Sequence, residues 1–327
     1  MKIIFAGTSI SAVAILDTLY NSGHDIILTL TKPDLPSGRG MKLNFSPVKK
    51  YALKHSIKII QPISLKLNGK YHNMANEVHN LLNKIKFDIM IVVAYGLILP
   101  YSILKIPYYG CINIHYSLLP RWRGPAPVPR AIEAGDISTG VTIIKMDSGI
   151  DTGPIISQDS IKILPEDTSL TLQNKLEKLS KILIINTIQK IEHDMTRLFL
   201  KPQSNIGANY APLIKKNEAV LDWSLSAKTL MRKINAFNPF PGAITHYISY
   251  KNKKKNILKI WKAHALSIKS TEKPGTILSV NFHNGILVAC GKNVIKLLEL
   301  QKVNKKKISA IEFINGFIKD IEFFVSS

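Results

Sequence analysis

Short apolar runs alternate with helical stretches through the first part of this chain, and this alternation constrains the fold more than any other feature. Ile3–Ala6 is an apolar run, residues 10–21 carry apolar positions at helical spacing, and Ile26–Leu30 is the next strand candidate. Further strand candidates follow at Ile57–Ile60, Ile89–Val93 and Cys111–His115. Strands that alternate with helices predict an α/β domain with a mostly parallel sheet. In such sheets the ligand lies beyond the carboxyl ends of the strands.

The pattern changes near residue 200. Residues 168–191 have the leucine and isoleucine spacing of a long helix, whereas Lys201–Ala211 is irregular and rich in Pro, Asn and Gly. Beyond it, short apolar runs with turn residues between them predict a small β-barrel. These runs are Ile244–Tyr250, Leu258–Ala263, Gly275–Val280, Gly285–Ala289 and Val294–Leu300. We therefore divide the chain into a first domain (1–191), a linker (192–207) and a C-terminal domain (208–327).

Positive charge is concentrated in the C-terminal part. The chain of 327 residues has a formal net charge of +22. Residues 1–207 hold 24 Lys/Arg and 15 Asp/Glu, and residues 208–327 hold 20 Lys/Arg and 7 Asp/Glu. This asymmetry predicts a polyanionic partner, most often a nucleic acid. A lysine-rich composition bias is the alternative explanation for part of the excess.

The sequence also indicates the cellular environment of the protein and whether it binds a metal. Cys111 and Cys290 lie far apart, so we expect no disulfide framework and a reducing, cytoplasmic environment. The N-terminus lacks the features of a signal peptide. No apolar run reaches the roughly 18 to 20 residues of a membrane span. There is no CxxC, no HExxH and no cluster with metal-ligand spacing, and we expect no metal.

Three polar residues have the types that acyl chemistry on a carbonyl requires. Asn113 and His115 are two apart on a strand candidate, so their side chains point to the same face. Asp151 follows in a Gly-rich loop and is suited to orient a histidine. An amide donor, an imidazole and a carboxylate together supply general acid/base catalysis and charge stabilisation. None is an obvious nucleophile, which favours direct transfer over a covalent intermediate. A structural histidine is the alternative for His115, one of nine in the chain.

Two loops have both a plain and a functional interpretation. The Pro- and Gly-rich segment 31–42 is expected to lack regular structure. It is either a solvated surface loop or an arm that presents Arg39 and Lys42 to phosphates or bases. In the loop around Asp151, the second carboxylate, Asp147, either takes part in the chemistry or caps a turn.

Many segments of the chain match the motifs of one family, and the match runs nearly end to end. The sequence strongly resembles the methionyl-tRNA formyltransferase family of the formyltransferase superfamily. The sharpest matches are Lys32-Pro33-Asp34, Gly38-Arg39-Gly40, Ser46–Lys49, Val93–Pro100, Ile112–His115, Ser117–Gly124, Met146–Gly153, Asp222-Trp223-Ser224 and Ala236–Pro239.

The resemblance implies a Rossmann-like formyltransferase domain followed by an OB-like β-barrel that holds tRNA by its charge. It places the catalytic roles on Asn113, His115 and Asp151, which span 38 residues in this chain. It implies 10-formyltetrahydrofolate as the formyl donor and the α-amino group of methionyl initiator tRNA as the acceptor. We expect the protein to act as a monomer without a metal.

The same resemblance implies the binding residues. The Arg39 loop is similar to the one that enters the acceptor end of the tRNA, so Arg39 and Lys42 are the expected tRNA contacts. Three positions depart from the family pattern at or near the site: Tyr116, Pro125 and Pro129. The expected folate contacts are Ala94, Tyr95, Gly96, Ser117, Leu118, Leu119, Pro120 and Asp147.

Other functions stay open at this point. A formyl transferase acting on glycinamide ribonucleotide or an amino sugar shares the three catalytic residues, but does not need a basic barrel. A non-catalytic RNA-binding protein on the same scaffold is the alternative of another class. A nicotinamide-dependent oxidoreductase is excluded, because the turn after Ile3–Ala6 lacks the GxGxxG pattern.

Overall fold

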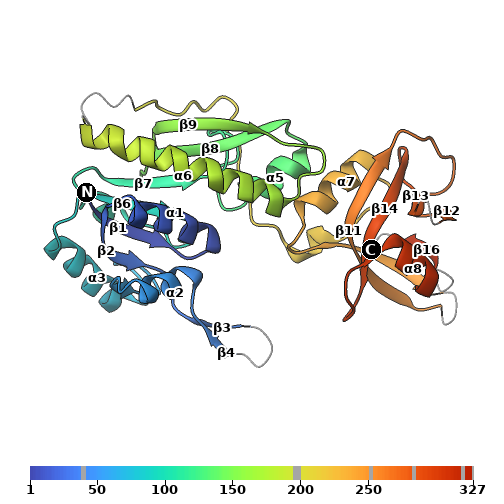
Figure 1. Cartoon of the computed structure of the whole chain (residues 1–327), viewed down its shortest axis with the longest axis horizontal. Helices are drawn as coiled ribbons and strands as arrows, with labels where there is room; N and C mark the ends of the chain where they lie inside the picture. Colours follow the sequence, from blue (N-terminus) through green and yellow to red (C-terminus); the bar gives the residue numbers. More distant parts are fainter. Residues whose placement is uncertain (38–41, 194–199, 250–252, 282–284, 318–320, 326–327) are drawn as a thin grey trace. The chain divides into compact units, whose positions relative to one another are not determined.

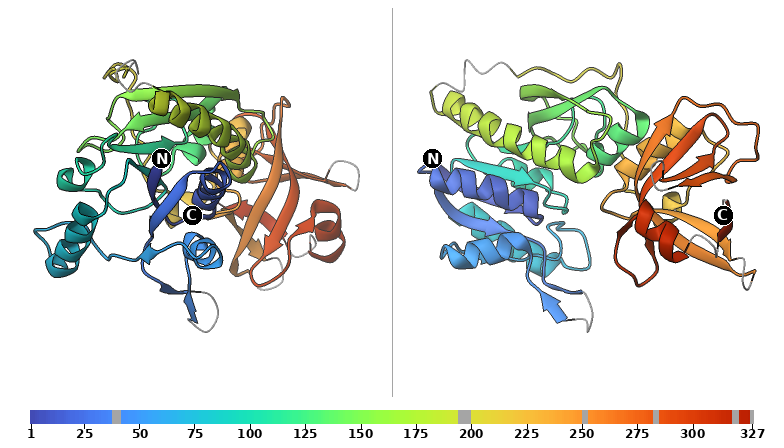
Figure 2. Two further views of the ribbon diagram at one scale, coloured as in Figure 1. Left: turned by 60° about the vertical axis from the view of Figure 1, so that its left-hand side comes forward. Right: turned by 45° about the vertical axis from the view of Figure 1, so that its right-hand side comes forward.

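A computed structural model describes residues 1–37, 42–193, 200–249, 253–281, 285–317 and 321–325. The chain forms two compact units, and each is described by itself (Figures 1 and 2). Unit 1 contains Met1–Pro127, Thr139–Ile161 and Asn174–Ala211, and unit 2 contains Val128–Ser138, Lys162–Gln173 and Pro212–Ser327. The domain boundaries that we place at residues 191 and 208 stay a prediction.

Unit 1 is built on a seven-stranded sheet of order β5-β2-β1-β6-β7-β8-β9. Strands β5, β2, β1, β6 and β7 pair in parallel, and β8 joins β7 in the antiparallel direction. The prediction of an α/β domain with a mostly parallel sheet is therefore confirmed. The strands are β1 (Lys2–Gly7), β2 (Asp25–Leu30), β5 (Ile59–Ile60), β6 (Ile89–Val93), β7 (Cys111–His115), β8 (Ser138–Lys145) and β9 (Ile155–Lys162).

Both faces of the central strands are buried. Residues Ile3 to Ala6 of β1 are all 0% exposed, so helices must cover the sheet on each side. α1 packs against β1, β2 and β6, and α3 and α4 contribute to a core with β1 and β6. The helices of unit 1 are α1 (Ile10–Asn21), α2 (Pro47–Lys54), α3 (His72–Lys84) and α4 (Tyr101–Leu104). α6 (Ser169–His193) begins in unit 2 and continues through unit 1, and α5 (Pro127–Ala134) belongs to unit 2 from Val128 onward. Within the described residues, no helix combines the length and the apolar character that crossing a membrane requires.

A two-stranded ribbon projects after β2. β3 (Leu35–Ser37) pairs with β4 (Lys42–Asn44), so the expectation that segment 31–42 has no regular structure is wrong for these residues. The Pro and Gly residues of this segment predicted a loop. Strands of three residues are too short for an alternation of apolar and polar residues to reveal them. Lys49 binds Asp34 at the base of the ribbon, and Gln61 Nε2 donates to Asp34 Oδ1 at 2.9 Å. Arg39 lies outside the described residues.

Unit 2 is dominated by a curled antiparallel sheet of order β12-β13-β14-β11-β10-β16, with β15 added on β14. Its edges approach where the Phe324 N–H donates to the Gly275 carbonyl at 3.1 Å. Trp223, Phe313 and Phe324 are buried in the core that the curled sheet encloses. A small β-barrel was predicted from the short strands and the turn residues between them, and the family resemblance implied its OB-like form. The elements are β10 (Ala243–Ser249), β11 (Lys255–Leu266), β12 (Ile277–Asn281), β13 (Gly285–Ala289), β14 (Val294–Lys302), β15 (Ile308–Ser309), β16 (Ile321–Val325), η2 (Lys216–Ala219), α7 (Ala227–Ala236) and α8 (Ala310–Phe317).

Two distant segments of unit 2 are joined by an ion pair. Arg130 in α5 binds Glu218 in η2 with Nη1 to Oε2 at 2.8 Å and Nη2 to Oε1 at 3.2 Å. The Arg130 guanidinium also pairs with Glu133 at 2.7 Å. The hydrogen bond from Arg130, assisted by the Lys215 backbone N–H, holds the pKa of the Glu218 carboxyl below its usual range.

This pKa shift predicts a pH-dependent contribution to stability. A depressed folded-state pKa stabilises the fold above the unfolded value of about 4.3, and the effect is lost as pH falls through the folded pKa. We expect Glu218→Gln to lower the free energy of unfolding by about 1 kcal/mol at neutral pH, and by less as pH approaches about 3. Melting temperatures across this range measure it, with the exposed Glu166→Gln as the matched control. A deficit that stays constant with pH contradicts the assignment.

Candidate active site

Strand β7 carries two polar side chains at its carboxyl end, on an otherwise apolar strand. Asn113 is in register with Val92 of β6 and Ile144 of β8, and His115 is opposite Thr142. The two residues are separated by the buried Ile114, so the strand period sends both side chains to one face.

Asp151 brings the third group to this point from the loop between β8 and β9. Its Oδ1 accepts a hydrogen bond from Asn113 Nδ2 at 2.9 Å, and its Oδ2 lies 3.5 Å from His115 Nδ1. The Gly124 backbone N–H donates to the same Oδ2 at 2.8 Å. The His115 side chain is 6% exposed and that of Asp151 15% exposed, so the contacts form in a largely dry environment. The three residues singled out from the sequence therefore converge.

The imidazole is held at both nitrogens. His115 Nε2 lies 2.7 Å from the Trp122 carbonyl oxygen, and a carbonyl only accepts, so Nε2 carries a proton in this contact. Nδ1 then faces the Asp151 carboxylate. Both ring nitrogens therefore lie against oxygen atoms of the protein, which fixes the orientation of the ring.

The Asp151 loop is folded tightly. Asp151 has φ +54°, a left-handed conformation that Asp adopts more readily than most residues. A Cβ on Gly153 would lie 1.9 Å from the Lys145 carbonyl oxygen, so only glycine fits there. Asp147 Oδ1 accepts from the Gly149 N–H at 3.0 Å and from Thr152 Oγ1 at 2.6 Å. Asp147 thus caps the turn that leads to Asp151, and its contact with folate stays a prediction.

The segment after β7 is fixed by side chains from β8 and β9. Thr142 Oγ1 donates to the Ser117 carbonyl at 2.6 Å, and Gln158 Nε2 donates to the Leu119 carbonyl at 3.1 Å. Leu119 is buried against Ile144 and Ile155. Leu118 and Pro120 are partly exposed beside it. Because the Leu119 side chain is enclosed, only its backbone and the side chains of Leu118 and Pro120 are placed to contact a ligand from this turn.

The loop after β6 holds the other expected folate contacts. Ala94 has φ +43° and Gly96 has φ +77°, and Thr8 Oγ1 donates to the Tyr95 carbonyl at 2.8 Å. The Tyr95 ring is 2% exposed and packs in the core, and burial raises the pKa of its phenol. The backbone of this loop, rather than the Tyr95 ring, is therefore placed at the carboxyl end of the sheet.

The structure accommodates Tyr116, Pro125 and Pro129, the three positions that we expect to differ from the family pattern. The Tyr116 hydroxyl lies 3.4 Å from Ser180 Oγ on α6, and burial raises the pKa of Tyr116 to about 12. Pro129 falls in the first turn of α5, where a backbone N–H has no partner within the helix. Pro125 precedes that helix.

Sequence reasoning missed several contributors. The Trp122 carbonyl and Gly124 N–H act through the backbone, and Gln203 and Asn209 lie in a segment interpreted as irregular. Gln203 Nε2 donates to the Asp151 carbonyl at 2.8 Å, and Asn209 Oδ1 accepts from the Trp122 N–H at 2.6 Å. No signal in the composition of this segment marks either residue.

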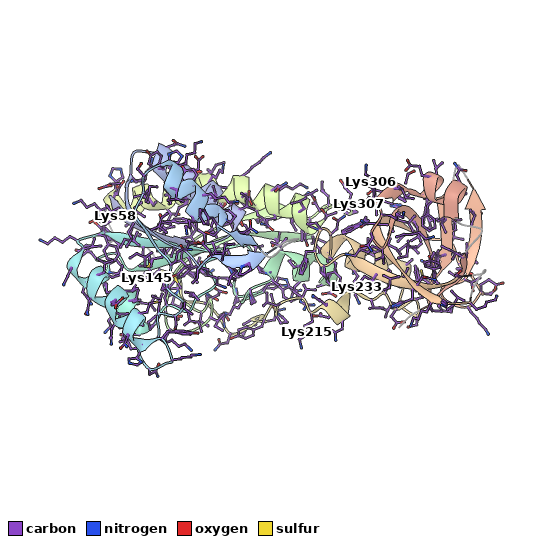
Figure 3. All side chains as sticks on the ribbon, turned by 90° about the horizontal axis from the view of Figure 1, so that it is seen from below. Lys58, Lys145, Lys215, Lys233, Lys306 and Lys307 are labelled. Carbon is purple, nitrogen blue, oxygen red and sulfur yellow. The ribbon has the colours of Figure 1, made fainter. Side chains whose placement is uncertain are left out.

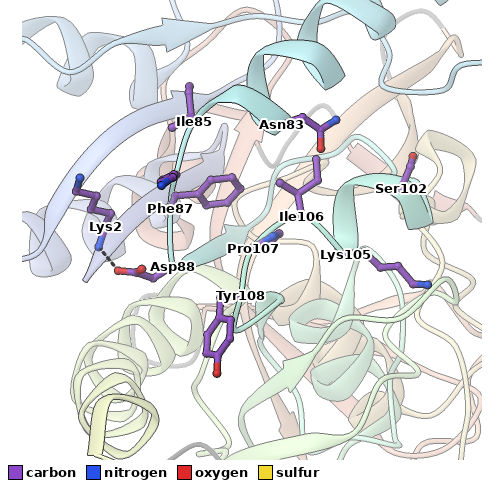
Figure 4. Close-up of a pocket in the computed structure, with 11 residues that line it drawn as sticks. Lys2, Asn83, Ile85, Phe87, Asp88, Ser102, Lys105, Ile106, Pro107 and Tyr108 are labelled. Carbon is purple, nitrogen blue, oxygen red and sulfur yellow. Dashed lines mark hydrogen bonds between the residues drawn. The ribbon is translucent and has the colours of Figure 1, made fainter.

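A hollow of about 960 Å³ lies elsewhere in unit 1 (Figure 4). It is lined by Lys2 at the start of β1, Asp88 just before β6, and the segment around Lys105. The Lys2 backbone N–H donates to Asp88 Oδ2 at 2.7 Å. These are the amino ends of the strands, whereas the converging polar groups are at the carboxyl ends. We therefore do not assign the chemistry to this hollow.

Comparison with known families gives the identification. A model described as formyl transferase matches residues 1–188, and a model described as formyl transferase, C-terminal domain, matches residues 213–318. The chain belongs to the formyl transferase family. The resemblance noted from the motifs is thereby confirmed.

Full-length relatives of this formyl transferase are similar throughout. It is 49% identical to the methionyl-tRNA formyltransferase of Janthinobacterium sp. (strain Marseille) over 97% of this chain and 98% of that protein. It is 47% identical to the methionyl-tRNA formyltransferase of Herminiimonas arsenicoxydans over 99% of this chain and 100% of that protein.

Solved structures share the fold. WlaRD, a sugar 3N-formyl transferase crystallised with dTDP and 5-N-formyl-THF, matches with a TM-score of 0.62 at 21% identity, over 94% of this chain and 99% of that chain. HypX from Aquifex aeolicus in complex with tetrahydrofolic acid matches with a TM-score of 0.61 at 14% identity, over 99% of this chain and 50% of that chain.

Proposed function

We propose that this formyl transferase moves the formyl group of 10-formyltetrahydrofolate to the α-amino group of methionyl initiator tRNA. The observation that carries the proposal is the convergence of Asn113, His115 and Asp151 in the formyl transferase domain. Sequence identity of 49% to a methionyl-tRNA formyltransferase, over nearly the whole length of both chains, supports the choice of acceptor.

The proposed reaction is direct transfer. The neutral amine attacks the formyl carbon, a new C–N bond forms, and the bond from that carbon to the folate nitrogen breaks. The amine loses one proton, which ends on the departing folate nitrogen. Folate supplies an activated formyl group, and the residues of the chain stabilise charge and move the proton.

Each catalytic residue has a proposed role that follows from its contacts. Asn113 Nδ2 has two N–H groups and gives one to Asp151, so the other is proposed to bind the developing oxyanion. His115, which lies between the Trp122 carbonyl and the Asp151 carboxylate, is proposed to stabilise the same oxyanion. Asp151 orients both side chains and accepts the proton during its transfer.

Two loops suit a folate at the carboxyl edge of the sheet. They follow the neighbouring parallel strands β6 and β7, where ligands of open α/β sheets bind. Partly exposed Leu118 and Pro120 offer apolar surface, and the loop with positive φ at Ala94 and Gly96 offers backbone groups. The proposed contacts are Ala94, Tyr95, Gly96, Ser117, Leu118, Leu119, Pro120 and Asp147.

Binding of tRNA is proposed to depend on the basic surface of unit 2 and on the ribbon of unit 1. Exposed Lys306 and Lys307 lie side by side between β14 and β15 of unit 2 (Figure 3). Lys307 Nζ lies 3.6 Å from the centre of the Trp261 ring. Arg39 and Lys42 are the proposed contacts from the ribbon. Phosphate contacts of this kind make affinity fall with salt.

The proposal includes a cytoplasmic location and a monomer. Cys111 and Cys290 are buried free cysteines that form no disulfide with each other. Burial raises the pKa of both thiols to about 12. Such thiols fit a reducing compartment. One chain supplies all three catalytic residues, so the site does not require a second copy.

A formylation assay with several acceptors tests the function. Purified protein and 10-formyltetrahydrofolate are mixed with methionyl initiator tRNA, methionyl elongator tRNA, glycinamide ribonucleotide or an amino sugar nucleotide. We expect formyl-methionyl-tRNA from the initiator at a rate far above the others. Faster formylation of either small acceptor, or no formylation of any acceptor, contradicts the proposal.

A further inference from the structure

A strap of irregular chain completes the active site from outside the regions that the family models match. The models cover residues 1–188 and 213–318. The described strap, Lys201–Ala211, lies between them and belongs to unit 1. Its composition predicts a linker, yet it makes hydrogen bonds to both loops that hold the catalytic groups.

The strap is paired at both ends. Ile155 and Lys201 exchange backbone hydrogen bonds of 2.8 and 2.9 Å just after the Asp151 loop. The backbone N–H of Arg123 donates to the Asn209 carbonyl at 3.0 Å, and the backbone carbonyl of Arg123 accepts from the Ala211 N–H at 2.7 Å. The strap therefore bridges the Asp151 loop and the segment that carries the Trp122 carbonyl.

Gln203 joins these two loops through its side chain. Its Nε2 donates to the Asp151 carbonyl at 2.8 Å and to the Gly153 carbonyl at 2.7 Å. Its Oε1 accepts from Arg123 Nε at 3.1 Å and Nη2 at 2.9 Å. One amide thus uses both N–H groups on one loop and its oxygen on the other.

The contact between Gln203 and Arg123 pairs a buried guanidinium with a neutral amide. Arg123 is 6% exposed, and its side chain binds a neutral amide in the described part of the chain. A buried cation is costly unless its N–H groups have acceptors. The Gln203 side-chain oxygen must therefore face the Arg123 guanidinium. The orientation of the amide is then set, so its N–H groups must face the Asp151 loop.

We propose that Gln203 is a positioning residue that sets the place of Asp151 against His115. Gln203 reaches the backbone of Asp151, while Arg123 lies between Trp122, whose carbonyl holds His115, and Gly124, whose N–H holds Asp151. The hydrogen bonds of Gln203 go to two backbone carbonyls and to Arg123, and not to the three catalytic side chains. Its effect on rate rests on the proposed function, because a displacement of about 1 Å in a reacting group costs up to 100-fold.

Gln203→Glu separates positioning from a merely structural role. Glutamate keeps an acceptor for Arg123 but loses the donors to the Asp151 and Gly153 carbonyls. We expect kcat for formyl transfer to fall about 10- to 100-fold, with KM for both substrates within about threefold. Gln203→Met, which keeps the length without hydrogen bonds, is the second variant. The exposed Gln189→Ala on α6 is the matched control and keeps the parent kcat.

A second measurement does not depend on the acceptor. The ¹⁵N resonances of the His115 ring report its contacts at Nδ1 and Nε2, and we expect them to move in both Gln203 variants but not in Gln189→Ala. Unmoved His115 resonances, or a parent-like kcat in Gln203→Glu, overturn the proposal. If the parent protein does not formylate methionyl-tRNA, the proposed function fails and the resonances alone decide the role of Gln203.

Discussion

Asp151→Asn is expected to lower the single-turnover rate of formyl transfer by about 10²- to 10⁴-fold. The carboxylate accepts from Asn113 Nδ2 and the Gly124 N–H, and it faces His115 Nδ1. The two carboxylate oxygens accept from two different N–H donors, and an asparagine has only one side-chain oxygen, so its own N–H₂ must face one of these donors. The variant also loses the negative charge beside His115 and the carboxylate that is proposed to accept the transferred proton.

The rate of Asp151→Asn is measured with both substrates saturating, so that weaker binding does not enter. Asp159→Asn is the matched control, because Asp159 is exposed on β9 and lies outside the converging groups. We expect the control to retain the parent rate and Asp151→Asn to remain folded, with a lower melting temperature because buried donors lose acceptors. A rate for Asp151→Asn within about threefold of the parent rules out its proposed role.

The parts of the site that regular structure positions were predictable from the sequence. A strand has a side-chain period of two, so Asn113 and His115 had to share a face once 111–115 was identified as a strand. Alternating apolar runs likewise predicted the parallel sheet, and the sheet placed these residues at its ligand-binding edge. These inferences succeed because local sequence determines the period and the neighbours along one element.

The parts that depend on backbone groups of distant segments were not predictable. His115 is held by the Trp122 carbonyl and Asp151 by the Gly124 N–H, and every residue type supplies such groups. Gln203 is separated from Asp151 by 52 positions. A polar side chain in a Pro- and Asn-rich segment has no pattern that marks it as a partner of a particular loop. Tertiary contact alone assigns its role.

The sequence predicted a loop after the second strand, but it did not predict the pairing of β3 with β4. Strands of three residues are too short for an apolar alternation to appear, and Pro36 within β3 favours a loop interpretation. The contact between Lys49 and Asp34 gives the ribbon a fixed base on α2.

Asn113→Ala is expected to lower kcat by about 10²- to 10³-fold, equivalent to about 2.7 to 4 kcal/mol of barrier. Alanine removes the N–H proposed to bind the oxyanion, and it also removes the hydrogen bond to Asp151 Oδ1. Asp151 keeps the Gly124 N–H and its approach to His115, so the remaining two groups stay in place. The oxyanion forms only during the reaction, so KM for both substrates should change by less than about threefold.

The measurement is a full kinetic comparison of Asn113→Ala with Asn186→Ala, a matched change at an exposed position of α6. A fall in kcat at constant KM identifies a group that acts in the transition state. A rise in KM at constant kcat assigns Asn113 to substrate binding instead and contradicts its proposed role. Because Asp151 anchors the Asn113 amide, Asp151→Asn combined with Asn113→Ala should lose less than the product of the two single effects.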